Sequence, residues 1–133
     1  MINSDQVKSY NDKGYLVVEN AIPQDKLKEL QRVTDEYVIN SKDVVSNDEV
    51  YDLADDHSSS NPNLRRLKNP HLLHKVYENI TKDPCILDIV EKIVGNNIRR
   101  DHTKLNFKGA RGGESIEWHQ DWAFYPHTND DIV

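Results

Sequence analysis

The chain has 133 residues and a formal net charge of −6, so it is one domain at most and lacks the basic surface that nucleic-acid binding requires. It has no apolar run long enough to span a bilayer, no stretch typical of a signal peptide, and a single cysteine, Cys85, which excludes an internal disulfide. We therefore expect a cytoplasmic protein without nucleic-acid or membrane partners.

Helices dominate the first 95 residues of the predicted fold. Capping residues and the helical spacing of apolar side chains mark them: Ser4 caps the first helix, Gly14 ends it, and Asp83 with Pro84 opens the last one. The predicted helices span residues 5–12, 23–40, 70–80 and 84–94. The polar stretch 41–63 offers few side chains to bury, which predicts a long loop.

Strands are predicted mainly after residue 95, where the apolar pattern changes to a period of two. The predicted strands span residues 15–18, 98–102, 104–108 and 115–119. We therefore predict an α+β arrangement in a single domain over residues 1–133. In it, the helical region 1–95 packs on the strands of region 96–133.

His119 and Asp121 stand two positions apart among bulky aromatic residues. Alternation along an extended backbone would place both side chains on one face, and Trp118 and Gln120 on the other. An imidazole nitrogen and a carboxylate oxygen on one face are two of the three protein ligands of a 2-His-1-carboxylate iron site. Roughly 0.7 such pairs are expected by chance in this composition. A surface histidine beside a turn aspartate therefore remains an alternative.

The surroundings of this pair resemble the phytanoyl-CoA dioxygenase family of Fe(II)/2-oxoglutarate-dependent oxygenases. The resemblance rests on Asn106-Phe107-Lys108, the glycine-rich loop 109–114 and Trp118-His119-Gln120-Asp121, with a weaker match over 14–23. It implies that the chain is the N-terminal half of a longer enzyme, with an incomplete double-stranded β-helix (jelly-roll) core. In the family, a second iron histidine and a 2-oxoglutarate-binding arginine come on later strands, and neither has a candidate here.

The resemblance also implies the roles of four residues. His119 and Asp121 would bind Fe(II), and Asn106 would contact the cosubstrate 2-oxoglutarate. Lys104, two residues from Asn106 on the same strand face, would add positive charge near a carboxylate; the alternative is a solvated strand residue. Retention of Asp121 implies hydroxylation, since halogenating relatives have a small residue at this position. The implied reaction hydroxylates a C–H bond of a small-molecule substrate, with succinate and CO₂ as coproducts.

With two of three ligands, the isolated chain is expected to bind iron weakly and to be inactive. Its partner would be the missing C-terminal half, or it would self-associate through exposed strand edges. By family analogy Arg65 or Arg66 reaches the ligand pocket; otherwise both are solvated. The rival hypotheses are a non-catalytic, acidic interaction module with an incidental His-x-Asp and, third, a cupin-like metal isomerase.

Overall fold

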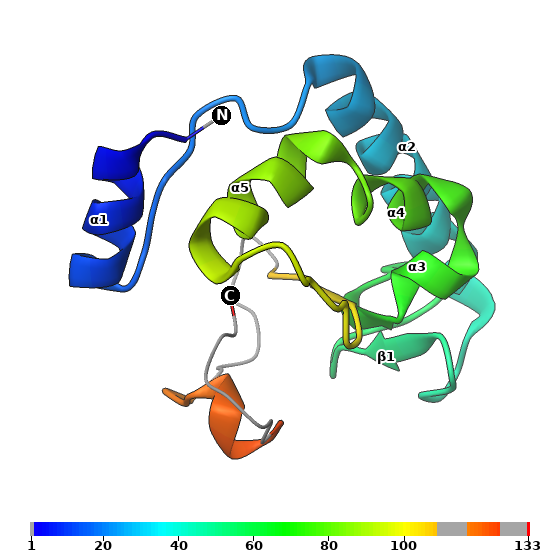
Figure 1. The fold of residues 1–133 in the computed structure, drawn as a ribbon. Helices are drawn as coiled ribbons and strands as arrows, with labels where there is room; N and C mark the ends of the chain where they lie inside the picture. The colour runs from blue at the N-terminus through cyan, green and yellow to red at the C-terminus, as the bar shows by residue number, and fades with distance from the viewer. Residues whose placement is uncertain (1, 109–116, 126–132) are drawn as a thin grey trace.

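The computed structural model describes residues 2–108, 117–125 and 133 (Figure 1). The helices in these ranges are α1 (Ser4–Lys13), α2 (Gln24–Asn40), α3 (Pro70–Leu73), α4 (Lys75–Ile80) and α5 (Pro84–Val94), with short 3₁₀ helices η1 (Ser41–Asp43) and η2 (Asp121–Ala123). The strands are β1 (Tyr51–Leu53), β2 (Leu64–Lys68) and β3 (Lys104–Asn106). The glycine-rich loop 109–114 and residues 115–116 of a predicted strand lie outside the described residues.

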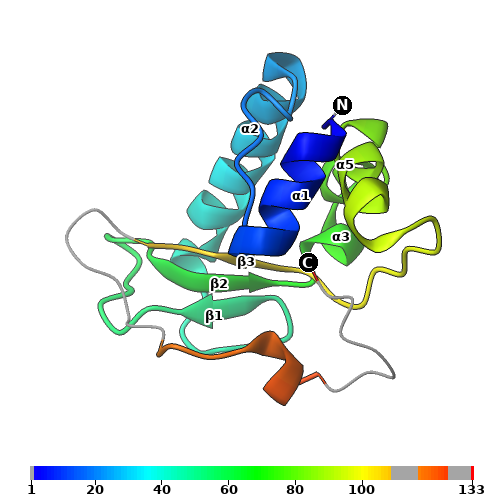
Figure 2. The same cartoon turned by 60° about the vertical axis from the view of Figure 1, so that its left-hand side comes forward.

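The three strands form one antiparallel sheet in the order β1-β2-β3. Leu67 of β2 lies opposite Tyr51 of β1 and Leu105 of β3, and all three pack into the core under the helices. Arg66 and Asn106, one position along, are paired across β2 and β3 and point to the other face. Figure 2 shows the α-helices gathered on one side of this sheet and the orange turn of η2 on the other. The α+β class is therefore confirmed, while the jelly-roll core stays a prediction.

The core lies between the sheet and helices α2 and α4. Val33 of α2, Leu67 of β2 and Tyr77 of α4 are buried and form one cluster. The Tyr77 hydroxyl is 2.8 Å from the hydroxyl of Thr34, so this buried polar group has a partner. Partly buried side chains surround the cluster: Leu30, Tyr37, Val50, Tyr51, Leu73, Val76, Leu105 and Phe107. Burial of these apolar groups fixes the position of the sheet relative to the helices.

The predicted helices at both ends of the helical region are confirmed, with one difference in capping. Asn3, not Ser4, caps α1: its side chain accepts a hydrogen bond from the Gln6 N–H, and the Gln6 side chain accepts one from the Asn3 N–H. Gly14 ends α1 with φ of 78°, in the left-handed region that favours glycine. Asp83 caps α5 as predicted.

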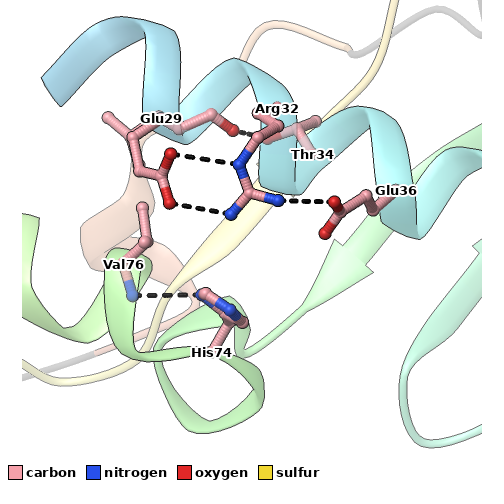
Figure 3. Close-up of polar contacts among 7 residues, drawn as sticks. Glu29, Arg32, Thr34, Glu36, His74 and Val76 are labelled. Carbon is pink, nitrogen blue, oxygen red and sulfur yellow. Dashed lines mark hydrogen bonds and ion pairs between the residues drawn. The ribbon is translucent and has the colours of Figure 1, made fainter. Parts of the chain in front are cut away.

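The helix predicted over 70–80 is interrupted at His74 and forms α3 and α4 instead. His74 has an extended backbone, with φ of −149° and ψ of 140°. Its ring Nδ1 accepts a hydrogen bond from the Val76 N–H at 3.2 Å, which caps α4 (Figure 3). His74, which lies inside the predicted helix, therefore forms the boundary between two shorter helices.

The N-terminal segment contacts the rest of the chain through α5. Ile2 is buried, and its carbonyl accepts a hydrogen bond from Lys92 Nζ at 2.6 Å. The strand predicted over 15–18 is wrong, because this run forms no regular element and pairs with no strand in the described part of the chain. Tyr15 and Val17 are accordingly exposed. A strand-like apolar pattern becomes a strand only beside another strand.

The stretch 41–63, predicted to be a loop, contains η1 and β1 and is held by polar contacts. The Nε2 atom of His57 lies 3.1 Å from the carbonyl oxygens of both Ser41 and Val44. On the other side of the ring, Nδ1 accepts a hydrogen bond from the Asn63 N–H at 3.0 Å. These contacts order a segment with few apolar side chains, which composition alone did not indicate.

The sequence does not predict β2, because a bulge breaks its alternation. The pairing register shifts between Asp52 and Leu53, so Arg65 is an extra residue opposite β1. The two buried leucines of β2, Leu64 and Leu67, are therefore three positions apart. Strand β1 lies within the predicted loop 41–63, and both β1 and β2 belong to region 1–95, in which helices are predicted to dominate.

After residue 95 the described chain has less strand than predicted. The expected strand over 104–108 is confirmed in part as β3, whereas 98–102 and 117–119 are not strands. The outer strands of the described sheet are β1 and β3, and self-association through their edges stays a prediction. Among the helices in the ranges given above, none is long and apolar enough to cross a membrane.

Candidate metal centre

A tight turn brings the His119 and Asp121 side chains together. Gln120 is extended, and η2 begins at Asp121, whose carbonyl accepts hydrogen bonds from the N–H groups of Phe124 and Tyr125 at 2.9 and 3.0 Å. His119 Nε2 lies 3.3 Å from Asp121 Oδ1, and the two side chains are 37% and 52% exposed. The two side chains therefore meet at the surface, although no strand directs them there.

The second ring nitrogen of His119 shows which atom is available to a ligand. His119 Nδ1 lies 2.7 Å from the carbonyl oxygen of Glu117. A carbonyl only accepts hydrogen bonds, so Nδ1 carries the proton and a neutral ring has its lone pair on Nε2. This lone pair faces the Asp121 carboxylate, and two electron-rich atoms at this separation need a proton or a cation between them. Metal-binding histidines commonly donate their other N–H to a backbone carbonyl in this way.

The distance between the two atoms also fits one shared ion. For bonds of about 2.1 Å from a divalent metal to nitrogen and oxygen, two ligands 90° apart are about 3.0 Å from each other, and two at the tetrahedral angle are about 3.4 Å apart. The observed 3.3 Å between His119 Nε2 and Asp121 Oδ1 falls between these values. The edge of the His119 ring also contacts Phe124, with ring centroids 5.7 Å apart, which restricts its rotation.

A third ligand is not found near this pair within residues 2–108 and 117–125. No group of three or more His, Cys, Asp or Glu side chains in these ranges could hold a metal ion. A second histidine–aspartate pair does exist: His102 Nδ1 is 2.9 Å from Asp101 Oδ2. The His102 ring also contacts the ring of Tyr125, with centroids 4.6 Å apart, so His102 contacts the segment that carries His119 and Asp121.

The predicted cosubstrate residues Asn106 and Lys104 both lie on β3 and are exposed on the same face. Asn106 Oδ1 accepts a hydrogen bond from Arg66 Nε at 3.0 Å. No hydrogen bond or ion pair joins these two residues to the His119–Asp121 pair in the described part of the chain. The structure thus shows two separate clusters, one on the sheet and one in the segment 117–125.

Sequence reasoning missed the partners of Arg65 and Arg66. Arg65 donates two hydrogen bonds to the buried carboxylate of Asp52, at 3.1 and 2.8 Å, and Arg66 contacts Asn106. Both contacts would follow from the pairing of β2 with β1 and β3. That pairing is not predicted, because the bulge breaks the alternating pattern of β2. Trp118, expected to point away from the metal, is fully exposed.

An α+β body followed by a closely spaced His–Asp pair fits the class of mononuclear iron oxygenases. The family model for phytanoyl-CoA dioxygenase matches residues 10–133, and the chain belongs to this family. The match covers the sheet, both site clusters and most of the helical region. The family predicted from the residues around His119 is therefore confirmed.

Curated relatives are similar to the chain over most of its length. A probable alpha-ketoglutarate-dependent hypophosphite dioxygenase from Stutzerimonas stutzeri is 33% identical over 130 residues, which are 98% of this chain and 45% of the relative. An ectoine dioxygenase from Bordetella bronchiseptica is 23% identical over 97% of this chain and 40% of its own length. An L-proline trans-4-hydroxylase from Streptomyces griseoviridis is 29% identical over 50% of this chain and 25% of its own length. The chain thus spans less than half the length of these relatives.

Proposed function

We propose that this chain contributes His119 and Asp121 as two metal ligands to the active site of an Fe(II)- and 2-oxoglutarate-dependent dioxygenase. The observation that supports this most is the approach of His119 Nε2 to Asp121 Oδ1 at 3.3 Å, with His119 Nδ1 on the Glu117 carbonyl. Membership of a dioxygenase family, with a relative named as alpha-ketoglutarate-dependent, supports Fe(II) and 2-oxoglutarate as the cofactors. The third protein ligand comes from outside the described residues.

Bound Fe(II) and 2-oxoglutarate would supply the oxidation: 2-oxoglutarate is decarboxylated to succinate and CO₂, and one oxygen atom of O₂ enters the substrate. The chain's own residues position the components. The Glu117 carbonyl fixes the ring of His119 with Nε2 outward. Asp121 fills the carboxylate position, which supports hydroxylation. On β3, Asn106 and Lys104 offer a hydrogen-bond donor and a positive charge to a carboxylate.

A small-molecule substrate is supported by the relatives, which are named for small molecules. One candidate is a small organic compound hydroxylated at a C–H bond, as the names of the ectoine and proline enzymes indicate. A second candidate is a small inorganic anion such as hypophosphite, favoured by 33% identity over 98% of the chain. The cations Lys68 and Lys104, paired across β2 and β3, fit an anionic ligand.

The metal site can be tested by anaerobic titration of Co(II) into the ¹⁵N-labelled 133-residue chain. Paramagnetic Co(II) should first broaden the amide signals of residues 117–125, because it replaces Fe(II) between His119 and Asp121. We expect binding weaker than micromolar, since two ligands do not close the site. His119→Ala and Asp121→Ala should each abolish the local broadening.

The matched control is His71→Ala, which removes a histidine whose ring Nδ1 contacts Thr103 Oγ1 and should leave the broadening at 117–125 intact. Broadening that survives in both site variants would show that His119 and Asp121 do not bind the metal. Micromolar or tighter binding that is lost in His119→Ala would support the site and contradict the expected weak affinity. The same chain, supplied with Fe(II) and 2-oxoglutarate, should release no succinate above the metal-only background.

A further inference from the structure

Arg66 and Asn106 form a directly opposed pair on the face of the sheet that points away from the α-helices. They are register partners across β2 and β3, and Arg66 Nε lies 3.0 Å from Asn106 Oδ1. Their neighbours in register, Leu67 and Leu105, pack into the core on the opposite face. The pair is therefore anchored by the core from behind while its polar groups face outward.

The chemistry of arginine fixes the orientation of the Asn106 amide. A guanidinium group donates hydrogen bonds and never accepts them, so the atom that Asn106 turns toward Arg66 must be its oxygen. With the amide flipped, the NH₂ group would face another donor, and a hydrogen bond would be lost. Arg66 therefore leaves the Asn106 NH₂ group, with both of its hydrogens, directed away from β2.

Arg66 is available to Asn106 because another residue satisfies the nearest carboxylate. Asp52 is the β1 register partner of Arg66 and would be a stronger acceptor than an amide. However, the bulge at Arg65 places that guanidinium on Asp52, where it makes two hydrogen bonds at 3.1 and 2.8 Å. The two adjacent arginines thus have different tasks: Arg65 neutralises a buried aspartate, and Arg66 orients an asparagine.

The outward NH₂ group recognises ligands with acceptor atoms. Lys104 is exposed two positions along the same strand face; its side chain makes no hydrogen bond or ion pair with the residues described here and adds a positive charge. We propose that Arg66 is a positioning residue, which holds the Asn106 amide so that its NH₂ group donates to a carboxylate of 2-oxoglutarate. This inference rests on the proposed role of Asn106 in binding that cosubstrate.

The test is a titration of the ¹⁵N-labelled 133-residue chain with 2-oxoglutarate at millimolar concentrations, followed through the side-chain NH₂ signals of Asn106. The ligand should shift these signals saturably, whereas sodium sulfate at equal ionic strength should not. Arg66→Met should weaken the apparent affinity by about three- to tenfold, the effect of losing one oriented hydrogen bond. Arg66→Lys, which can still donate to Asn106 Oδ1, should restore most of it.

Two further variants separate orientation from charge and from folding. Arg99→Met removes one positive charge from an exposed residue outside the sheet, and should change neither the free Asn106 NH₂ signals nor the affinity. Arg66→Met should move the free NH₂ signals, which a purely structural role elsewhere would leave in place. Asn106→Asp keeps an acceptor for Arg66 but has no NH₂ group, so backbone signals of 104–106 should lose their response to the ligand.

The outcomes distinguish the two proposals. If Asn106→Asp binds 2-oxoglutarate as the unmodified chain does, the proposed role of Asn106 is wrong, and the inference on Arg66 falls with it. If Asn106→Asp loses binding while Arg66→Met and Arg66→Lys bind normally, only the inference on Arg66 is overturned. Absence of a saturable shift in the unmodified chain would overturn both.

Discussion

The helix-covered sheet and the segment 117–125 are held in place by different kinds of contact. In the first region, Val33, Leu67 and Tyr77 are buried, and side chains from α2, β2 and α4 hold one another in position. In the second region nothing is buried among residues 117–124, and a contact between the rings of Tyr125 and His102 joins this segment to the rest of the described chain. One region is fixed by packing, and the other by local hydrogen bonds.

Because of this difference, the stability of the sheet and the geometry of the candidate metal site depend on different contacts. The His119–Asp121 geometry depends on the Glu117 carbonyl and on the η2 turn, all within a few residues. A change in the core should therefore unfold the sheet without altering the pair directly, and a change in the pair should leave the sheet intact. Asn106 belongs to the first region, so the cosubstrate cluster depends on the core while the metal pair does not.

The largest expected effect comes from the core. Leu67→Ala removes a fully buried side chain and should lower the free energy of unfolding by about 2–5 kcal/mol. Urea unfolding followed by far-UV circular dichroism should report this change. Both tryptophans, Trp118 and Trp122, lie in the site segment and are substantially exposed, so their emission should change little through the same transition. A strongly blue-shifted emission that is lost with the dichroism signal would show that the two regions unfold as one.

The same contrast explains how much of the molecule the sequence predicts. Helices α1, α2 and α5 follow from caps and apolar spacing, because both signals are local. Strand β2 does not, because the bulge at Arg65 places buried Leu64 and Leu67 three positions apart. A bulge depends on the partner strand, which periodicity along one segment does not contain.

The candidate site shows the same limit. The closeness of His119 and Asp121 follows from their short separation along the chain, although the turn at η2, and not the expected strand alternation, brings them together. The partner of Asn106 does not follow from local spacing, because Arg66 is 40 residues away and reaches it only through the register of β2 with β3. The strand predicted over 15–18 fails for a related reason: its pattern is local, whereas a partner strand is not.

An intermediate loss of stability is expected on removal of the ion pair between Arg65 and the buried Asp52 in the sheet. Asp52→Asn keeps the side-chain shape but removes the charge that accepts both hydrogen bonds of Arg65, and should cost about 1–3 kcal/mol in urea unfolding. The matched control is Glu36→Gln on α2, whose partner Arg32 is also held by Glu29 (Figure 3). These three side chains are about half exposed, so the control should be nearly neutral. Equal effects of the two variants would contradict the distinction between packed and exposed ion pairs.

The smallest effect on stability is expected at the first turn of α5, and this effect depends on pH. Asp83 forms an ion pair with Lys26 of α2 and accepts a hydrogen bond from the Cys85 N–H at 3.0 Å. The Lys26 hydrogen bond and, next, the Cys85 N–H lower the pKa of Asp83 to about 2. A carboxyl group whose pKa is lower in the folded state than in the unfolded chain, where it is about 3.9, favours folding while it is ionised.

The sign of the pH dependence follows from these two values. The contribution of Asp83 should be fully present above about pH 4 and should be lost as the pH falls through about 2, the folded-state pKa. Thermal unfolding of the unmodified chain and of Asp83→Asn should therefore differ above pH 4 and converge toward pH 2. Asp88→Asn, on the exposed face of the same helix, provides the control for a lost negative charge. A difference between the unmodified chain and Asp83→Asn that stays constant down to pH 2 would contradict the lowered pKa of Asp83 in the folded chain.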